Sequence, residues 1–233
     1  MRFAGIAALL VIGSPGAAAA QVTPEEVRNA CESGNAAECA HFGQMLASGV
    51  LITQSNTEAF RYYGRSCDMG YPPACTTLGI WYEGGLHVNP DLPKAAGYYR
   101  RACEAQDAQG CALMGSMFEQ GKGVIQNPAT GAQYYRRACE LGRMSACVKM
   151  GALYESGGGV SPDARTAATF YQRACEGGNA NGCVLLGNMY DNGRGVYRDT
   201  DRAAAYYARA CEIGNVQACR LPMPDARGML ISP

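Results

Sequence analysis

Residues 139–147 read CELGRMSAC, and residues 175–183 read CEGGNANGC. This C-x7-C spacing occurs six times at a constant step of 36 residues and uses all 12 cysteines of the chain. The pairs are Cys31 and Cys39, Cys67 and Cys75, Cys103 and Cys111, Cys139 and Cys147, Cys175 and Cys183, and Cys211 and Cys219. A fixed period of about 20 to 50 residues is typical of repeat proteins, in which each unit buries its apolar face against its neighbours. The spacing therefore predicts a solenoid.

The segment after each second cysteine has the pattern of an amphipathic helix. A large apolar residue stands three and seven positions after the cysteine, with glycine at position four, as in Leu78, Gly79 and Tyr82. Such spacing places the residues on one helix face. Glycine within that face predicts a close helix crossing, because it otherwise costs about 1 kcal/mol relative to alanine.

A second helix is predicted before each first cysteine. It begins after a polar capping residue such as Asp91 and carries an aromatic pair such as Tyr98 and Tyr99. Glycine follows the first cysteine by three positions in every repeat except one, where Gln106 predicts a turn that is strained or differently built. The expected fold is all-α: an α/α solenoid of about five 36-residue helix-turn-helix repeats over 21–221, followed by a tail at 222–233.

The two cysteines of each pair fall at the end of one predicted helix and the start of the next. Antiparallel helices around the glycine turn bring such positions within disulfide range, so six local bridges are expected. Two alternatives stay open at this stage: zinc ligation between stacked pairs, and a redox-active dithiol relay. Zinc is disfavoured because the spacing is not that of a zinc knuckle and only His41 and His87 could supply nitrogen ligands.

The N-terminus indicates export. An apolar run over residues 3–12 precedes a small-residue segment ending at Ala20, so residues 1–20 are expected to be a secretory signal peptide cleaved there. Cysteine-rich frameworks belong to oxidising compartments, so a periplasmic or secreted protein is expected. The 20 basic and 20 acidic side chains balance, which gives no indication of a nucleic-acid or anionic-membrane partner.

The repeat motif resembles a known family. The patterns A-x-x-Y-Y-x-R-A-C-E-x-G and A-C-x-x-L-G-x-x-Y-x-x-G-x-G-V-x-x-D, over about residues 24–221, are similar to the Sel1-like repeat of the tetratricopeptide superfamily. The C-x7-C pairs make the chain similar to the secreted Helicobacter cysteine-rich proteins. That resemblance implies β-lactam binding or β-lactamase activity, and a related mitochondrial respiratory-chain assembly factor implies an assembly or redox role.

The residues themselves favour a non-catalytic scaffold for a protein or peptide partner. The serine and zinc hydrolase motifs S-x-x-K, S-D-N, K-T-G, G-x-S-x-G and H-E-x-x-H do not occur in the sequence. Ser145 and Lys149 stand one helical turn apart, but in one repeat only. No catalytic residue, metal ligand or cofactor is assigned, and the chain is expected to be a monomer.

The expected binding surface is the face of the first helices that points away from the packing side. Its residues vary from repeat to repeat: His41, Gln44, Thr77, Ile80, Trp81, Leu113, Ser116, Lys149 and Asn188. Solenoids of this kind usually line their concave surface with the first helix, so a partner peptide is expected there. Trp81, the only tryptophan, is expected to anchor it, although its column (Met45, Trp81, Met117, Leu153, Met189) also fits core between repeats.

A basic column accompanies the first cysteines. Arginine stands two positions before the cysteine and an acidic residue one position after it, as in Arg101 and Glu104. Such i,i+3 pairs are expected along each second helix. A functional alternative has the arginines bind an acidic partner or a carboxylate-bearing cell-wall fragment.

Overall fold

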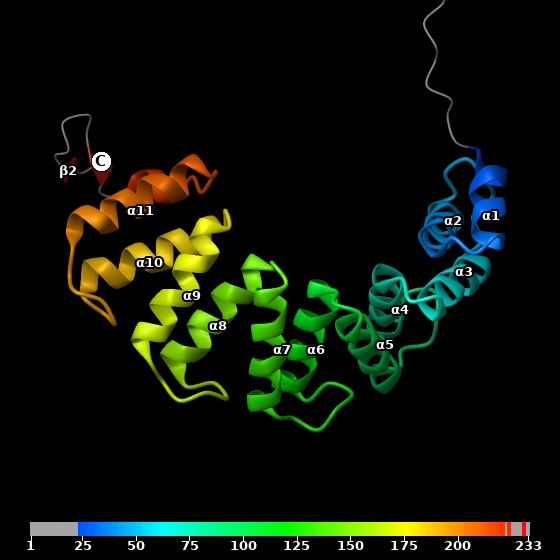
Figure 1. The fold of residues 1–233 in the computed structure, drawn as a ribbon, viewed down its shortest axis with the longest axis horizontal. Helices are drawn as coiled ribbons and strands as arrows, with labels where there is room; N and C mark the ends of the chain where they lie inside the picture. Colours follow the sequence, from blue (N-terminus) through cyan, green and yellow to red (C-terminus); the bar gives the residue numbers. More distant parts are fainter. Residues whose placement is uncertain (1–22, 222, 225–229, 232–233) are drawn as a thin grey trace, which may run out of the picture.

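The computed structural model describes residues 23–221, 223–224 and 230–231, so the predicted signal peptide lies outside the described residues. The described chain is an arc of paired helices (Figure 1). The helices are α1 (Pro24–Glu32), α2 (Ala36–Ser48), α3 (Asn56–Asp68), α4 (Pro72–Gly84), α5 (Leu92–Glu104), α6 (Ala108–Gln120), α7 (Pro128–Glu140), α8 (Met144–Ser156), α9 (Ala164–Glu176), α10 (Ala180–Asn192) and α11 (Thr200–Glu212).

Two helices make one repeat, as the 36-residue period predicts. We call α2, α4, α6, α8 and α10 the A helices, and α3, α5, α7, α9 and α11 the B helices. Each B helix begins at the expected cap, where a side chain such as that of Asp91 accepts a hydrogen bond from the backbone N–H of Lys94. After α11 come a short 3-10 helix, Ala218–Arg220, and two antiparallel strands of two residues, β1 (Met223–Pro224) and β2 (Leu230–Ile231). Both strands lie in the predicted tail, outside the all-α solenoid.

Six disulfides staple the turns between helices, with the local pairing that the spacing predicts. The paired Cα atoms lie 4.4 to 4.8 Å apart, and among the described residues no cysteine is free. The bridges are Cys31–Cys39, Cys67–Cys75, Cys103–Cys111, Cys139–Cys147, Cys175–Cys183 and Cys211–Cys219. They account for the cysteines without zinc or a dithiol relay.

The sixth bridge differs from the other five in its second helix. The first five each link the last turn of one helix to the first turn of the next A helix, as between Cys31 in α1 and Cys39 in α2. Cys211 in α11 is instead bridged to Cys219 in the 3-10 helix that follows. The last bridge therefore ties the end of the solenoid to the segment that closes it.

Each repeat is packed at one close crossing between its A and B helices. A tyrosine four residues before the first cysteine lies against the glycine of the A helix, so that a Cβ at Gly187 would stand 2.5 Å from Cε1 of Tyr207. Tyr99 and Tyr171 block Gly79 and Gly151 in the same way. Glycine is thus required in these three repeats because the ring fills the space of a side chain. The crossing is looser at Gly115 and Gly43, where the nearest ring atoms would stand 3.0 and 3.3 Å from a Cβ.

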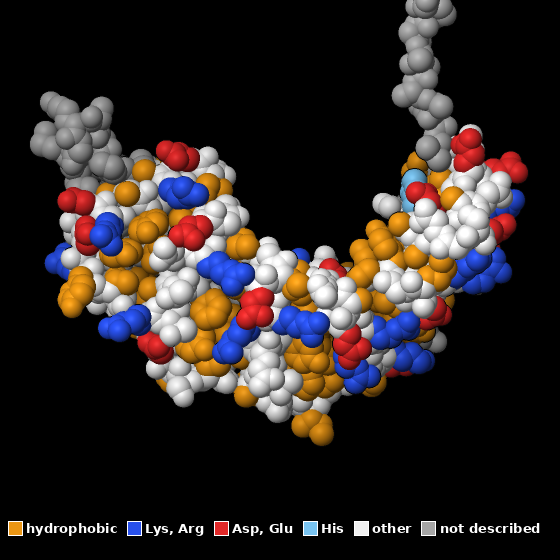
Figure 2. Space-filling model, viewed as in Figure 1, with side chains coloured by type: hydrophobic (Ala, Val, Ile, Leu, Met, Phe, Trp, Pro, Cys, Tyr) orange, Lys and Arg blue, Asp and Glu red, His pale blue; other side chains and the backbone are white. Residues whose placement is uncertain are grey.

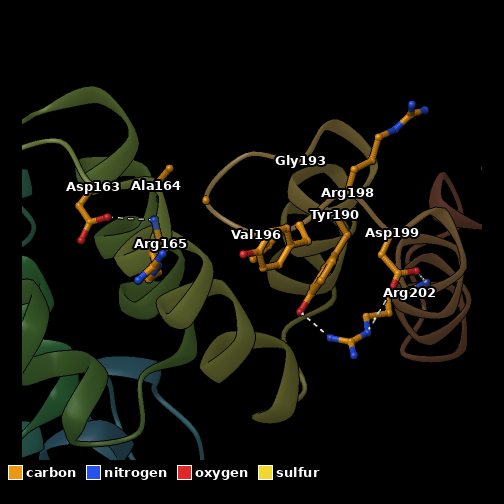
Figure 3. Close-up of a pocket in the computed structure, with 11 residues that line it drawn as sticks. Asp163, Ala164, Arg165, Tyr190, Gly193, Val196, Arg198, Asp199 and Arg202 are labelled. Carbon is orange, nitrogen blue, oxygen red and sulfur yellow. Dashed lines mark hydrogen bonds and ion pairs between the residues drawn. The ribbon is translucent and has the colours of Figure 1, made fainter.

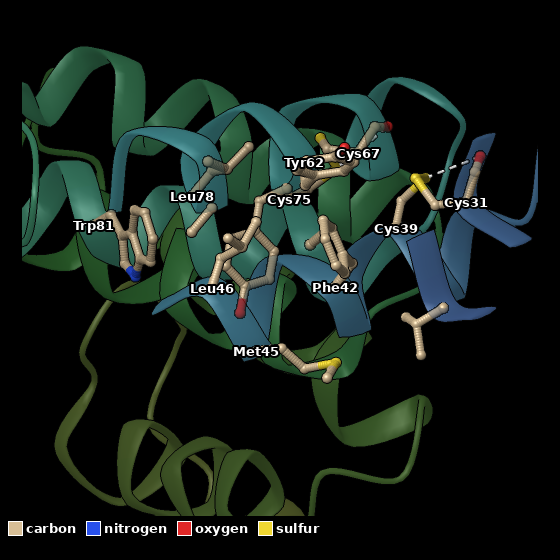
Figure 4. Packing of buried hydrophobic residues seen from close by; sticks show 14 of the residues in the cluster. Cys31, Cys39, Phe42, Met45, Leu46, Tyr62, Cys67, Cys75, Leu78 and Trp81 are labelled. Carbon is tan, nitrogen blue, oxygen red and sulfur yellow. Dashed lines mark hydrogen bonds between the residues drawn. A yellow bond between two sulfur atoms is a disulfide. The ribbon is translucent and has the colours of Figure 1, made fainter. Parts of the chain in front are cut away.

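The core runs between repeats, and Trp81 belongs to it. Phe42, Leu46 and Tyr62 pack near the first disulfides, and Figure 4 shows Trp81 and Leu78 continuing the same cluster. The Trp81 ring lies 5.3 Å from that of Tyr63 in an edge-on arrangement. The other members of its column are also buried: Met45, Met117, Leu153 and Met189.

The arginine column acts between repeats, which corrects the expectation of i,i+3 pairs. The Arg101 guanidinium donates to the carbonyl of Cys67 at 3.2 Å and pairs with Asp68 at 2.9 Å, both at the end of the preceding B helix. Arg65, Arg137 and Arg173 each donate to the carbonyl of the residue after the preceding first cysteine: Glu32, Glu104 and Glu140. A cation is favourable at the C-terminal end of a helix, where the last carbonyls have no partner within their own helix. The Cys67 carbonyl accepts from the Gly70 backbone as well. These arginines are therefore used inside the solenoid.

The turn at Gln106 leads to a first prediction. Gln106 has φ 64°, a left-handed conformation that the equivalent Gly142 adopts at φ 92°. That conformation costs an L-residue roughly 1–2 kcal/mol, partly offset by the greater chain entropy that glycine loses on folding. We expect Gln106→Gly to raise the free energy of unfolding by about 0.5–1 kcal/mol in denaturant titrations. Gly142→Ala is the matched control and should lower it by about 1 kcal/mol; a destabilised Gln106→Gly protein would contradict the account.

A second prediction concerns one bridge. In the chain-entropy model, removing the Cys139–Cys147 disulfide by a double alanine substitution costs about 2.5 kcal/mol for its short loop. Because contacts in a solenoid are between neighbours, the loss of protection in hydrogen exchange should concentrate in α7 and α8. Uniform loss of protection from α2 to α11 would show that the repeats do not behave as separable units.

Candidate interaction surface

The structure distributes the predicted surface residues over the A helices with unequal exposure. His41, Gln44 and Asn188 are exposed, and five others are half-buried: Thr77, Ile80, Leu113, Ser116 and Lys149. His41, Gln44 and Thr77 are brought together, since they line one cleft of about 340 Å³ between α2 and α4. Ile80 lies on α4 but does not line this cleft, and Leu113, Ser116, Lys149 and Asn188 lie farther along the solenoid.

Trp81 is not an exposed anchor, which corrects the expectation for this residue. Only 7% of its surface is exposed, and its ring is enclosed by Phe60, Tyr63 and His87. Burial of that large ring stabilises the junction between α3 and α4. The structure supports the alternative interpretation, in which Trp81 and the equivalent residues of the other repeats form core between repeats.

A ladder of tyrosine–glutamate hydrogen bonds runs along the A helices. The Tyr99, Tyr135 and Tyr171 hydroxyls donate to Glu83, Glu119 and Glu155 at 2.7, 2.9 and 2.6 Å. Tyr207 instead donates to the side-chain oxygen of Asn188 at 2.7 Å. The glutamates stand eight residues after the second cysteine, a column that sequence reasoning missed although alignment on the cysteines displays it.

Two of these glutamates also bind a cation from the following repeat. Lys149 Nζ lies 2.8 Å from Glu119, and the Arg194 guanidinium lies 2.9 Å from Glu155. Burial, and next the hydrogen bond to glutamate, raise the pKa of Tyr135 and of Tyr171 well above the usual range. The tyrosines are therefore neutral donors to charged carboxylates. The ion pair with Glu119 also occupies the Lys149 ammonium, which stands one helical turn from Ser145 in the sequence.

A larger cleft, of about 970 Å³, lies beside the loop from α10 to α11 (Figure 3). Asp163 and Asp199 on its wall cap the starts of α9 and α11. Hydrogen bonding, above all from the Thr166 hydroxyl, lowers the pKa of Asp163. Arg202 pairs with Asp199 at 3.2 Å. The positions of these charged groups are thus explained by helix capping.

The surface carries mixed charge. In the view of Figure 2, basic and acidic side chains alternate along the arc with hydrophobic patches between them. Within the described ranges, no group of three or more His, Cys, Asp or Glu side chains is placed to hold a metal ion. No described helix is long and apolar enough to cross a membrane.

Comparison with known proteins decides the family. A sequence model of the Sel1 repeat matches residues 36–71, 72–107, 108–142, 145–179 and 180–215, each one A helix with its B helix. The chain belongs to the Sel1 repeat family. Repeats of this family typically form scaffolds for protein–protein interaction. Comparison with curated protein sequences finds no significant match.

Solved structures of Sel1 repeat proteins are similar to this one. A protective antigen of uropathogenic Escherichia coli, c5321, has 32% identity and a TM-score of 0.79 over 86% of this chain, which spans only 43% of that protein. A Sel1 repeat protein from Oxalobacter formigenes has 28% identity and a TM-score of 0.70, covering 85% of this chain and 76% of its own. Helicobacter pylori cysteine-rich protein B has 30% identity and a TM-score of 0.45 over 54% of this chain and 96% of its own.

The core position of Trp81 gives a third prediction. Trp81→Ala should lower the free energy of unfolding by about 3–5 kcal/mol, because a large buried ring leaves a cavity. Thermal and denaturant unfolding of the purified protein measure the loss. Met189→Ala, in the same column, serves as a matched control with an expected loss of about 2–5 kcal/mol. An unchanged thermal midpoint for Trp81→Ala would show that the ring is not part of the core.

Proposed function

We propose that this Sel1 repeat protein is an exported, non-catalytic scaffold that binds a protein partner along the concave side of its arc, through the A helices. The observation that carries the proposal is the contrast between a repeated frame and a varied surface. The disulfides, the glycine crossings and the tyrosine donors recur, whereas the A-helix position five residues after the second cysteine changes from Gln44 through Ile80, Ser116 and Ala152 to Asn188. A constant frame with variable exposed residues is how solenoids present a specific binding surface.

Export is supported by the disulfides and by the leader-like sequence. Six disulfides are typical of proteins that fold outside the reducing cytosol. The proposal includes cleavage after Ala20 and a mature protein in the periplasm or outside the cell. N-terminal sequencing of protein recovered from the extracytoplasmic fraction tests this part.

A fourth prediction tests the binding surface. Chemical cross-linking in the extracytoplasmic fraction, followed by mass spectrometry, should identify a partner for the wild-type protein. The triple variant His41→Ala, Gln44→Ala, Asn188→Asp should retain its thermal midpoint, because these side chains are exposed and an aspartate still accepts from Tyr207, but lose at least about tenfold in affinity for that partner.

The matched control changes three exposed residues of the B helices: Arg61→Ala, Arg100→Ala and Gln172→Ala. It should bind the partner like the wild type. Loss of binding in the control alone would place the surface on the B helices. A saturable nitrocefin hydrolysis that one point substitution abolishes would replace the scaffold proposal with the β-lactamase activity that the family resemblance implied.

A further inference from the structure

One tyrosine of the ladder lacks the partner that the others have. Tyr63 occupies the same place in the first repeat as Tyr99 in the second, and its ring packs against Gly43. Its side chain is only 8% exposed, yet no hydrogen bond among the described residues involves its hydroxyl. Burial raises the pKa of Tyr63, so the hydroxyl is a neutral donor.

The missing partner is explained by the sequence of α2. Ala47 stands where Glu83, Glu119 and Glu155 stand in the next three A helices, eight residues after the second cysteine. A methyl group there offers no acceptor. Gln44 occupies the position of Asn188, which accepts from Tyr207, but in this structure it makes no hydrogen bond with Tyr63. The first repeat therefore keeps the donor and lacks the carboxylate.

The space around this donor is open. Tyr63 lines the cleft of about 340 Å³ between α2 and α4, with His41, Gln44, Thr77 and the apolar Ala74 and Pro73 around it. Thr77 donates to the Pro73 carbonyl, and His41 Nδ1 lies 3.3 Å from Glu38. Tyr71 also lines the cleft. The Gln44 amide and the hydroxyls of Tyr63 and Tyr71 make no hydrogen bond among the described residues and are the donors that a ligand can use.

The second repeat shows what this type of donor takes. Glu83 accepts from Tyr99, and no basic side chain of the described residues forms an ion pair with it. A tyrosine of the ladder therefore holds a glutamate carboxylate without a cation. Hydrogen bonds to a charged acceptor are stronger than those between neutral groups, so a carboxylate is the preferred acceptor.

We infer that the cleft between α2 and α4 binds a glutamate side chain of the partner protein, whose carboxylate accepts hydrogen bonds from the Tyr63 hydroxyl and the Gln44 amide. The partner glutamate takes the place that Glu83, Glu119 and Glu155 fill within the chain. The inference rests on the proposed scaffold function and names the side chain that one cleft between neighbouring A helices recognises. Ala74 and Pro73 supply apolar contact to the residues beside that glutamate.

The test uses capped peptides as probes and the full mature protein with its disulfides intact. Acetyl-Ala-Leu-Glu-Leu-Ala-amide should perturb backbone amide NMR signals of α2 and α4 and bind about tenfold tighter than the otherwise identical glutamine peptide. A glutamine peptide with a free C-terminal carboxylate distinguishes a side-chain carboxylate from a chain end. If that peptide binds as tightly as the glutamate peptide, the assignment to a side chain is wrong.

Two substitutions should remove the preference for glutamate. Tyr63→Phe deletes only the hydroxyl, and Ala47→Glu supplies an internal carboxylate that competes for it. Tyr171→Phe deletes an equivalent hydroxyl in a repeat where Glu155 is already bound, and it should leave peptide binding unchanged. A glutamate preference that survives both Tyr63→Phe and Ala47→Glu, or that is absent from the wild type, overturns the inference.

A gain of function completes the test. Glu83→Ala frees the Tyr99 hydroxyl and should create a second set of glutamate-dependent signals at α4 and α6; their absence counts against the assigned chemistry. The partner assay separates this inference from the scaffold proposal. Partner binding that depends on the A-helix surface but is unaffected by Tyr63→Phe would leave the scaffold standing and remove the glutamate site.

Discussion

The contact between a B-helix tyrosine and an A-helix glycine is the constraint on which the other features of each repeat depend. Glycine costs helix stability, but only its bare backbone leaves room for the ring against the A helix. The ring then directs its hydroxyl past the crossing to the far end of the A helix. There, one turn beyond Gly79, Glu83 is within reach of Tyr99. Packing and polar surface chemistry are thus set by one contact.

The disulfides stabilise a different part of the solenoid from the tyrosine–glycine crossing, namely the joints between repeats. They lie at the opposite end of the helix pair, where the B helix of one repeat turns into the A helix of the next, and both residues of pairs such as Cys139–Cys147 are buried. A solenoid has no central core that all repeats share, so each joint must be stable by itself. The bridges and the arginines that reach the preceding B helix fix the angle between repeats, while the tyrosines fix the packing within them.

The sequence was sufficient for the fold because its signals are local and periodic. Helix faces, caps such as Asp91 and the disulfide pairing all follow from spacing within one 36-residue unit. Contacts between units were harder to predict. Trp81 stood next to exposed positions in the helical projection, but the adjoining B helix covers it with Tyr63 and Phe60. Arg101 has an acidic neighbour on its own helix and yet pairs with Asp68 of the preceding B helix.

The candidate site was predicted in part, again from local periodicity. His41, Gln44 and Thr77 occupy the same face of their A helices and line one cleft. The role of Tyr63 could not be predicted, because it depends on the crossing that aims a B-helix side chain through to the A-helix surface.

The ladder also shows how repeats with the same packing come to differ in the polar groups on their A helices. The tyrosine donor is present in five repeats, and its acceptor changes: none in the first, glutamate alone in the second, glutamate with Lys149 or Arg194 in the third and fourth, and Asn188 in the fifth. The acceptors lie on the A helices and Arg194 lies in the loop after α10, whereas the buried ring and its glycine stay fixed. A repeat can therefore either bond its own tyrosine hydroxyl or leave it for a ligand through one half-buried residue, eight positions after the second cysteine, without altering the packing that positions the hydroxyl.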